Sequence, residues 1–323
     1  MIETLIIFIF LFLSYFLFKI LIIFQRKRKK GQVVREEGPK THLNKSGTPT
    51  FGGVIFIISF LLVYLFLPKD SLLNNFLLFV FLQSSIGFID DFMKVILKSP
   101  YGLIARYKLP LQFIFSIPAL IYFINTKHNL ILLPFTNRLI EISIPLFTGL
   151  FLFFVVGGIN SFNFADGLDG LLCGLSLILL PLFIFLSNGI PNLNKILLAI
   201  FGTLISFLWF NFHPAEIFMG DTGSTFLGAF FMYLIFLFRL EILMPLILFL
   251  FGLEIVSVIL QVGYFKITKK LYGEGKRIFK MAPIHHHFEL MGIPEEKVTV
   301  KFWIIQIILV IITFSLIYFG GRI

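Results

Sequence analysis

The chain alternates between long apolar segments and short polar ones. A helix that crosses a membrane needs about 20 mostly apolar residues, and ten segments have roughly this length and composition. Their expected bounds are 4–24, 51–67, 72–90, 109–125, 144–160, 168–187, 193–212, 222–240, 242–264 and 300–320. The pattern predicts an all-α, polytopic integral membrane protein with about ten transmembrane helices, forming one domain over residues 1–323.

Composition supports this prediction. Hydrophobic residues make up 58% of the chain, and the mean hydropathy is +0.97, far from the average of soluble proteins. The single cysteine, Cys173, lies in an apolar segment, which excludes a disulfide within the chain and a metal site built from cysteines. Alternating apolar and polar residues over 138–144 predict a short strand or hairpin between two helices.

The distribution of Lys and Arg predicts the orientation. If the segments alternate across the membrane, 25–50, 91–108 and 265–301 share one face and carry 8, 4 and 8 basic residues, 20 of the 27 in the chain. The side rich in Lys and Arg is normally cytoplasmic, so both termini are expected outside. The net charge of +10 is then explained by orientation and by attraction to membrane lipids, and nucleic-acid binding is not expected.

The first polar motif on the cytoplasmic face runs from Lys45 to Gly53, just before the second apolar segment. Its glycines and proline allow a tight turn with exposed N–H groups. Together with Lys45 and the hydroxyl of Thr50, these groups would suit an anion at a helix N-terminus. An ordinary loop with a helix cap is an equally good interpretation of this motif alone.

The second motif is the pair Asp90-Asp91, which ends the third segment. Neighbouring residues on a helix point about 100° apart, so one carboxylate can enter a pocket while the other accepts bonds from nearby basic residues such as Lys94 or Lys108. The alternative is that both acids face water at a helix end. A further acidic cluster on the same face favours a functional role.

That further cluster is Asn160 to Gly170, where two apolar segments meet with almost no loop. Asp166 and Asp169 have the i, i+3 spacing of one helical face, as do Asn160 and Asn163 if the helix continues. Helix capping by Asp166 is the simpler alternative. The repeated acids and amides favour a site close to the membrane surface.

The fourth motif contains Phe218 and Asp221 and precedes the eighth segment. Asp221 is able to cap that helix, or to bind Mg²⁺, which takes oxygen ligands and retains waters or substrate phosphates as the others. Phe218 is expected either to stack on a base or to pack.

The fifth motif is His285-His286-His287, between two apolar segments. Three consecutive histidines cannot all face one metal in regular structure, so they are expected to donate hydrogen bonds to a phosphate or sugar. Carboxylates near hydrocarbon are costly and are usually retained for ions, protons or substrates. The motifs together predict an active site at the cytoplasmic face that holds a divalent cation and a phosphorylated substrate.

In this order, the motifs resemble those of the phospho-N-acetylmuramoyl-pentapeptide-transferase family. The resemblance covers nearly the whole chain, and the histidine run separates this family from the polyprenyl-phosphate N-acetylhexosamine-1-phosphate transferases. It implies a multi-pass enzyme of the bacterial inner membrane that uses UDP-N-acetylmuramoyl-pentapeptide and undecaprenyl phosphate to make lipid I and UMP. Phe162, Phe164, Ala165 and Glu216 depart from the residue types expected of the family.

The resemblance also implies roles for individual residues. It places Mg²⁺ on Asp221, a base or nucleophile on Asp90-Asp91, phosphates near Lys45 and Lys108, and uracil near Phe218. Asp166 joins the catalytic candidates. The remaining substrate-binding candidates are Thr50, Asn160, Asn163, Asp169, His285, His286 and His287.

Two other functions remain open from the sequence. An N-acetylglucosamine-1-phosphate transferase of the same superfamily would be expected to lack the match at Pro283 to Glu289. An ion-coupled transporter would be expected to carry charges near mid-membrane in two halves of an inverted repeat. The sequence leaves the oligomeric state open, and a homodimer is compatible with it.

Overall fold

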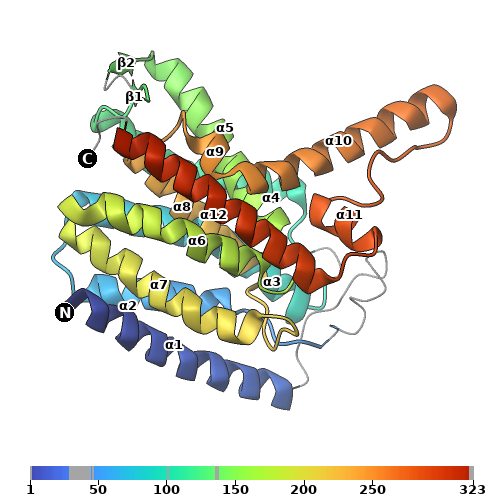
Figure 1. Ribbon diagram of the computed structural model, residues 1–323, viewed down its shortest axis with the longest axis horizontal. Helices are drawn as coiled ribbons and strands as arrows, with labels where there is room; N and C mark the ends of the chain where they lie inside the picture. Colours follow the sequence, from blue (N-terminus) through green and yellow to red (C-terminus); the bar gives the residue numbers. More distant parts are fainter. Residues whose placement is uncertain (1, 29–44, 46, 100–101, 135–137, 320–323) are drawn as a thin grey trace.

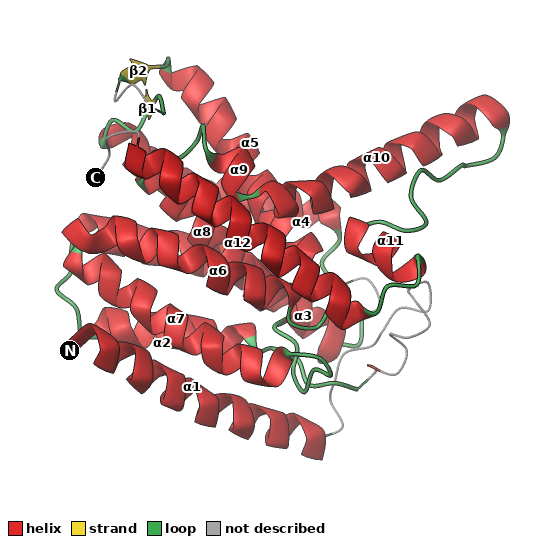
Figure 2. Cartoon of the chain, in the orientation of Figure 1, coloured by secondary structure: helices red, strands yellow, loops and turns green. Residues whose placement is uncertain are grey.

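The computed structural model describes residues 2–28, 45, 47–99, 102–134 and 138–319 of the chain (Figure 1). Most of this part is helical, with one small pair of strands (Figure 2). Within the described ranges, nine helices are long and apolar enough to cross a membrane. The all-α, polytopic membrane fold predicted from the sequence is therefore confirmed.

The elements follow one another along the chain in a simple order. The helices and strands are α1 (Ile2–Lys27), α2 (Gly53–Leu65), α3 (Ser71–Val95), α4 (Ala105–Asn125), β1 (Leu130–Leu132), β2 (Leu139–Glu141), α5 (Ile144–Ala165), α6 (Leu171–Leu186), the 3-10 turn η2 (Ser187–Gly189), α7 (Pro191–Asn211), α8 (Gly220–Leu237), α9 (Met244–Ile247), α10 (Phe249–Tyr272), α11 (Ile284–Leu290) and α12 (Glu295–Phe319).

Helix α8 is the centre of the bundle. It packs against α3, α5 and α2, and 83% of its spanning segment is buried. By contrast, the spanning segments of α1, α10 and α12 are each 22% buried, so these helices present apolar side chains to lipid. Because α8 is enclosed by protein, the polar groups at its first turn lie beside side chains of neighbouring helices.

Two of the ten predicted segments differ from the structure. The predicted 51–67 segment forms α2, which has 13 residues and is too short to count as a full span. The predicted 242–264 segment is broken at Leu248 into α9 and α10, and α10 continues to Tyr272. In Figure 1, α10 extends away from the other helices on the side where α11 lies.

The hairpin predicted around 138–144 is confirmed. Strands β1 and β2 pair antiparallel, with Ile131 opposite Ile140. The hairpin, the start of α1 and the end of α12 lie toward one end of the bundle in Figure 1, and α11 lies toward the other. The polar motifs described next gather at the α11 end.

Candidate functional site

Two acids and two lysines from three helices form the first part of the site. Lys94 of α3 donates to Asp90 at 2.7 Å and to Asp221 at 3.0 Å, and Lys108 of α4 donates to Asp221 at 3.1 Å. The ammonium of Lys108 also lies 3.7 Å from Asp90. Asp90 is buried, whereas Asp221 is partly open to solvent. The lysines hold two carboxylates together, and a phosphate group would compete for the same ammonium groups.

The carboxylate of Asp91 bonds to the start of α8 instead of to the two lysines. Its carboxylate accepts hydrogen bonds from the backbone N–H groups of Asp221 (2.9 Å) and Thr222 (2.8 Å), and from the Thr222 hydroxyl (2.6 Å). The pair predicted from sequence is thus divided, with Asp90 toward the lysines and Asp91 at the helix end. Because the cap comes from α3, the carboxylate of Asp221 is left free for another role.

Close contact between α3 and α8 depends on glycine at two positions. A Cβ at Gly87 would lie 2.2 Å from the carbonyl oxygen of Asp221. A Cβ at Gly220 would lie 2.4 Å from a carboxylate oxygen of Asp91, and Gly220 also has a positive φ of 73°. Side chains at either position would separate the capping acid from the helix that it caps.

The two asparagines of α5 contact this cluster differently. Asn163 donates to Asp221 at 3.0 Å and to Ser224 at 2.8 Å, so its amide lies in the site. Asn160 donates instead to Gln112 of α4 at 2.7 Å and to a carbonyl of its own helix. The structure therefore brings Asn163, but not the amide nitrogen of Asn160, into contact with the acidic group.

The prediction that Asp166 and Asp169 share one helical face is wrong. Helix α5 ends at Ala165 and α6 begins at Leu171, and between them the chain turns, with Gly170 at φ 73°. After the turn, the Asp169 carboxylate contacts Lys45 and His213, and Asp166 shares neither partner. Glycine permits this left-handed conformation, which the carboxylate spacing alone did not reveal.

Asp166 lies in an environment that disfavours its charged form. Its side chain makes no hydrogen bond or ion pair with any residue that the structure describes. Burial raises the pKa of Asp166 from 3.8 to about 7, and the negative charges of Asp91 and Asp169 raise it further in the same direction. A carboxyl with a pKa near neutrality can accept a proton at physiological pH.

Asp169 belongs to a second charged cluster. Lys45 donates to Asp169 at 2.7 Å and to Glu295 at 2.5 Å, and Nδ1 of His213 lies 3.1 Å from Asp169. The ligand atoms of Asp169, His213 and Glu295 all lie within 4.8 Å of one another, as a metal site would require. Because the ammonium of Lys45 contacts two of these three residues, the cluster already contains a compensating charge.

Lys45 is less exposed than its place in a loop suggests. Its side chain is 16% exposed and is held between two carboxylates from segments more than 100 residues away. The sequence motifs predicted a role for neither Glu295 nor His213. The available signal was an acid at the start of the last helix, on the face that carries the other motifs.

The motif from Lys45 to Gly53 joins this second cluster to α8. Gln25 of α1 clamps Thr50, with its amide donating to the Thr50 carbonyl at 2.6 Å and its oxygen accepting from the Thr50 N–H at 2.9 Å. The N–H groups of Gly52 and Gly53 bond to the carbonyls of Phe218 and Met219. Those N–H groups are therefore occupied, and the anion site expected there would have to use the Thr50 hydroxyl and Lys45.

Phe218 is half-buried beside this loop. Within the described residues its ring makes no aromatic contact. By contrast, Phe162, which departs from the expected family pattern, stacks on Phe251 with ring centroids 4.0 Å apart and belongs to the buried core. Phe218 thus has no aromatic partner in the described part of the chain, whereas Phe162 is a packing residue.

The three histidines have three different environments. His285 is fully buried, with Nδ1 3.0 Å from Glu254 of α10. Nδ1 of His286 lies 2.7 Å from Glu289, and Nδ1 of His287 accepts from the backbone N–H of Lys280 at 3.1 Å. The expectation that they would not converge on one metal agrees with this geometry. Only His286 and His287 retain exposed surface for a ligand.

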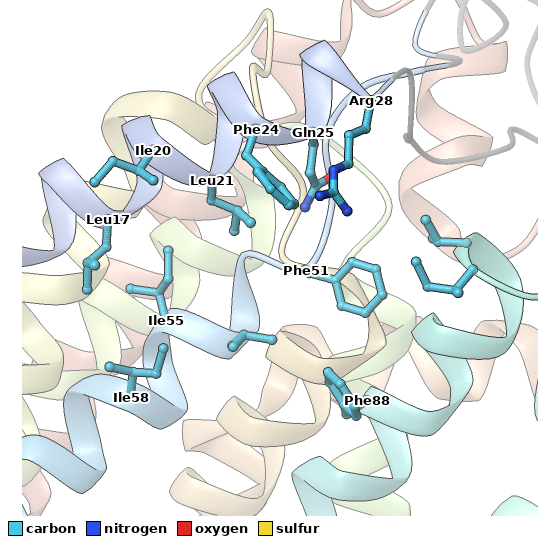
Figure 3. A pocket seen from close by; sticks show the side chains of 13 residues that line it. Leu17, Ile20, Leu21, Phe24, Gln25, Arg28, Phe51, Ile55, Ile58 and Phe88 are labelled. Atoms are coloured by element: carbon cyan, nitrogen blue, oxygen red, sulfur yellow. The ribbon is translucent and has the colours of Figure 1, made fainter.

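An apolar cleft of about 460 Å³ lies between α1, α2 and α3 (Figure 3). Phe51 and Phe88 line it, with ring centroids 5.9 Å apart, and Phe51 has a positive φ of 67°, which is rare for an aromatic residue. Arg28 and Gln25 supply the polar part of the lining. The lining suits a hydrocarbon chain, and Gln25 and Phe51 connect the cleft to the loop clamped at Thr50.

The chain resembles known proteins over most of its length. The model of glycosyl transferase family 4 matches residues 73–239. A protein of Caldanaerobacter subterraneus subsp. tengcongensis is 42% identical over 90% of both chains, and one of Francisella philomiragia subsp. philomiragia is 40% identical over 94% of this chain and 88% of its own. A Thermoanaerobacter protein is 41% identical over 90% of both chains. All three are named phospho-N-acetylmuramoyl-pentapeptide-transferase.

Proposed function

Since the chain belongs to glycosyl transferase family 4 and to the phospho-N-acetylmuramoyl-pentapeptide-transferases, we propose that it catalyses their reaction in lipid I synthesis. The donor is UDP-N-acetylmuramoyl-pentapeptide, the acceptor is undecaprenyl phosphate, and the second product is UMP. The main structural support is the cluster of Asp90, Asp221, Lys94 and Lys108 at one end of the bundle. The protein is an enzyme of the phospho-sugar transferase class.

Lys94 and Lys108 supply positive charge that offsets the repulsion between the two phosphorylated substrates. Two phosphorylated substrates bring several negative charges together, and catalysis of phosphoryl transfer depends on positioning and charge stabilisation. Lys94 and Lys108 now bond to carboxylates. We propose that they contact phosphate oxygens when the substrates bind, while Asp90 keeps their ammonium groups in position.

Asp221 is the residue best suited to hold Mg²⁺. The capping role that would explain it otherwise is performed by Asp91, and its carboxylate is partly open to solvent. The carboxylate of Asp90 supplies further oxygen atoms nearby, which is the donor chemistry that Mg²⁺ prefers, and the NH₂ group of Asn163 bonds to the Asp221 oxygen that the lysines leave. Bound there, the ion would neutralise charge on the donor phosphates. The cluster of Asp169, His213 and Glu295 fits Mg²⁺ less well, since one of its three ligands is a histidine nitrogen and Mg²⁺ prefers oxygen.

We assign proton acceptance to Asp166. The lipid phosphate carries a last proton with a pKa of about 6, by analogy with phosphorylated side chains. Asp90 is held by Lys94 and Lys108, and Asp91 by the start of α8, whereas Asp166 has a pKa of about 7 and no partner in the described part of the chain. The proton passes to the Asp166 carboxylate, which leaves the phosphate oxygen free to attack the donor.

The second cluster and Phe218 suit the nucleoside end of the donor. Phe218 offers a half-buried ring for stacking, and Lys45, Thr50 and Asp169 lie on the two segments that meet beside it. His286 and His287 remain the candidates for contacts with the sugar or its phosphate, and Asn160 would act through Gln112. The apolar cleft between α1, α2 and α3 is the surface that we propose for the acceptor's prenyl chain.

The protein crosses the membrane several times. We propose the bacterial inner membrane, with both termini outside and the site in the cytoplasm, because 20 of 27 Lys and Arg residues belong to the segments on the site's face. The sequence is compatible with a homodimer, and the proposed reaction does not depend on one.

The decisive experiment measures UMP release by the purified protein. UMP should appear only when UDP-N-acetylmuramoyl-pentapeptide, undecaprenyl phosphate and Mg²⁺ are all present. Replacing the donor with UDP-N-acetylglucosamine tests the related transferase activity and should give none. Release from that donor instead would overturn the proposed substrate, and no release from either would overturn the proposed reaction.

A further inference from the structure

Glu254 is an acid buried inside the apolar helix α10. Its side chain is 1% exposed, and α10 is one of the helices that can span a membrane. A carboxylate in such a place is costly unless a partner compensates its charge. In the ranges that the structure describes, the only ionisable partner in contact with it is His285, whose Nδ1 lies 3.0 Å from a Glu254 oxygen.

His285 is enclosed as completely as Glu254. It is fully buried, and neither of its ring nitrogens nor either Glu254 oxygen has a well-directed hydrogen bond within the described residues. The 3.0 Å contact is therefore the main compensation for two polar groups removed from water. Breaking such a pair from one side leaves a buried charge without its partner.

The other edge of the His285 ring lies against the turn that carries Asp166. A Cβ built on Gly167 would be 2.1 Å from Nε2 of His285. Glycine at this position lets the imidazole lie directly on the backbone of the turn. The pair thus connects α10 with the segment between α5 and α6.

Helix α11 carries His285 and has only seven residues. A helix of this length has little stability by itself and depends on packing. The ring of His286 lies next to that of His285, with centroids 4.1 Å apart, and Nδ1 of His286 contacts Glu289. The position of His286 therefore depends on how firmly His285 is held.

We propose that Glu254 is a positioning residue for the active site. Its carboxylate holds His285 against Gly167, and this contact sets α11 so that His286 faces the bound donor. The inference rests on the proposed function because it assigns the donor as the ligand of His286. It predicts that Glu254 acts on donor binding through His285 and not by itself.

The test is a double-mutant cycle on the purified, full-length protein. The variants are Glu254→Gln, His285→Gln and the two combined. Each single variant should raise the KM for UDP-N-acetylmuramoyl-pentapeptide by about tenfold, the scale seen when a supporting partner of a ligand residue is lost. The kcat should change by less than about threefold, because the reacting groups are untouched. The double variant should be no worse than the poorer single one.

A second buried histidine provides the matched control. His128 lies at the hairpin end of the bundle, where it contacts Thr126 and the carbonyl of Leu237. Combining His128→Gln with Glu254→Gln should give effects that simply add as free energies, since the sites share no partner. Additive effects of Glu254→Gln and His285→Gln would overturn the proposal, as would an unchanged donor KM in Glu254→Gln.

Gly167→Ala provides an independent perturbation if a charge variant fails to fold. It leaves both charges in place but pushes the His285 ring away from the turn. It should also raise the donor KM, and an unchanged KM would overturn the proposal. If the wild-type protein releases no UMP, the proposed function fails instead. The contact between Glu254 and His285 is then tested by the apparent melting temperatures of the same two single variants and their double variant. Losses in melting temperature that add in the double variant would refute the contact.

Discussion

The roles of Asp91 and Asp221, which are in contact where α3 caps α8, can be distinguished by experiment. Replacing Asp91 with alanine removes the acceptor of two buried backbone N–H groups and one hydroxyl. An unpaired buried donor costs about 1–3 kcal/mol. Taking about 1.5 kcal/mol for each N–H group gives a loss of about 3 kcal/mol in the free energy of unfolding.

This loss corresponds to a measurable change in melting temperature. An unfolding entropy of about 2.1 cal/mol/K per residue gives about 0.7 kcal/mol/K for the chain. The apparent Tm of Asp91→Ala should therefore fall by about 4 °C. Trp209 and Trp303 provide an intrinsic fluorescence signal for heating the protein in detergent.

Asp221→Ala is the matched control in the same contact. The carboxylate of Asp221 accepts from side chains of Lys94, Lys108 and Asn163, and its removal leaves Asp90 with the lysines. Its Tm should lie within about 1 °C of the wild type, while UMP release is lost. Equal melting of Asp91→Ala and the wild type, or an equally large fall in Asp221→Ala, would refute the capping argument.

Three further predictions follow from the site. Asp221→Asn should fold normally but require a much higher Mg²⁺ concentration for any UMP release, and normal turnover at low Mg²⁺ would exclude the metal assignment. In Asp166→Asn, the rise in kcat/KM as pH increases through about 7 should disappear. The unfolded chain loses the Asp166 proton near pH 4, whereas the folded protein keeps it up to a pKa of about 7, so the wild type loses stability as pH rises from about 4 to 7. Asp166→Asn escapes this loss, so its Tm should exceed that of the wild type at about pH 8 and equal it at about pH 4. A Tm difference that does not change with pH would contradict the raised pKa. Val54→Trp, which fills part of the apolar cleft, should raise the KM for undecaprenyl phosphate and leave the donor KM unchanged. The control Leu253→Trp, at an exposed position of α10, should change neither KM. An unchanged acceptor KM in Val54→Trp would show that the cleft does not bind the acceptor.

The sequence by itself determined the membrane fold and the location of the polar motifs. Bilayer thickness imposes a minimum length on each apolar segment, so most spans are visible without tertiary information. The alternation at 138–144 likewise predicted the hairpin, since strand periodicity is local. Local rules were insufficient at Leu248, where an apolar run is broken into α9 and α10.

Only the tertiary structure decided what each polar side chain contacts. Adjacent acids such as Asp90 and Asp91 look equivalent in sequence, and their roles differ because Asp90 bonds to Lys94, whereas Asp91 bonds to the N–H groups at the start of α8. The turn at Gly170 separates Asp166 from Asp169. Glu254 and Glu295 were missed because their partners, His285 and Lys45, lie far away in the chain. A charge in a membrane protein is tolerated through such long-range partners, and packing, unlike periodicity, has no short-range signal in the sequence.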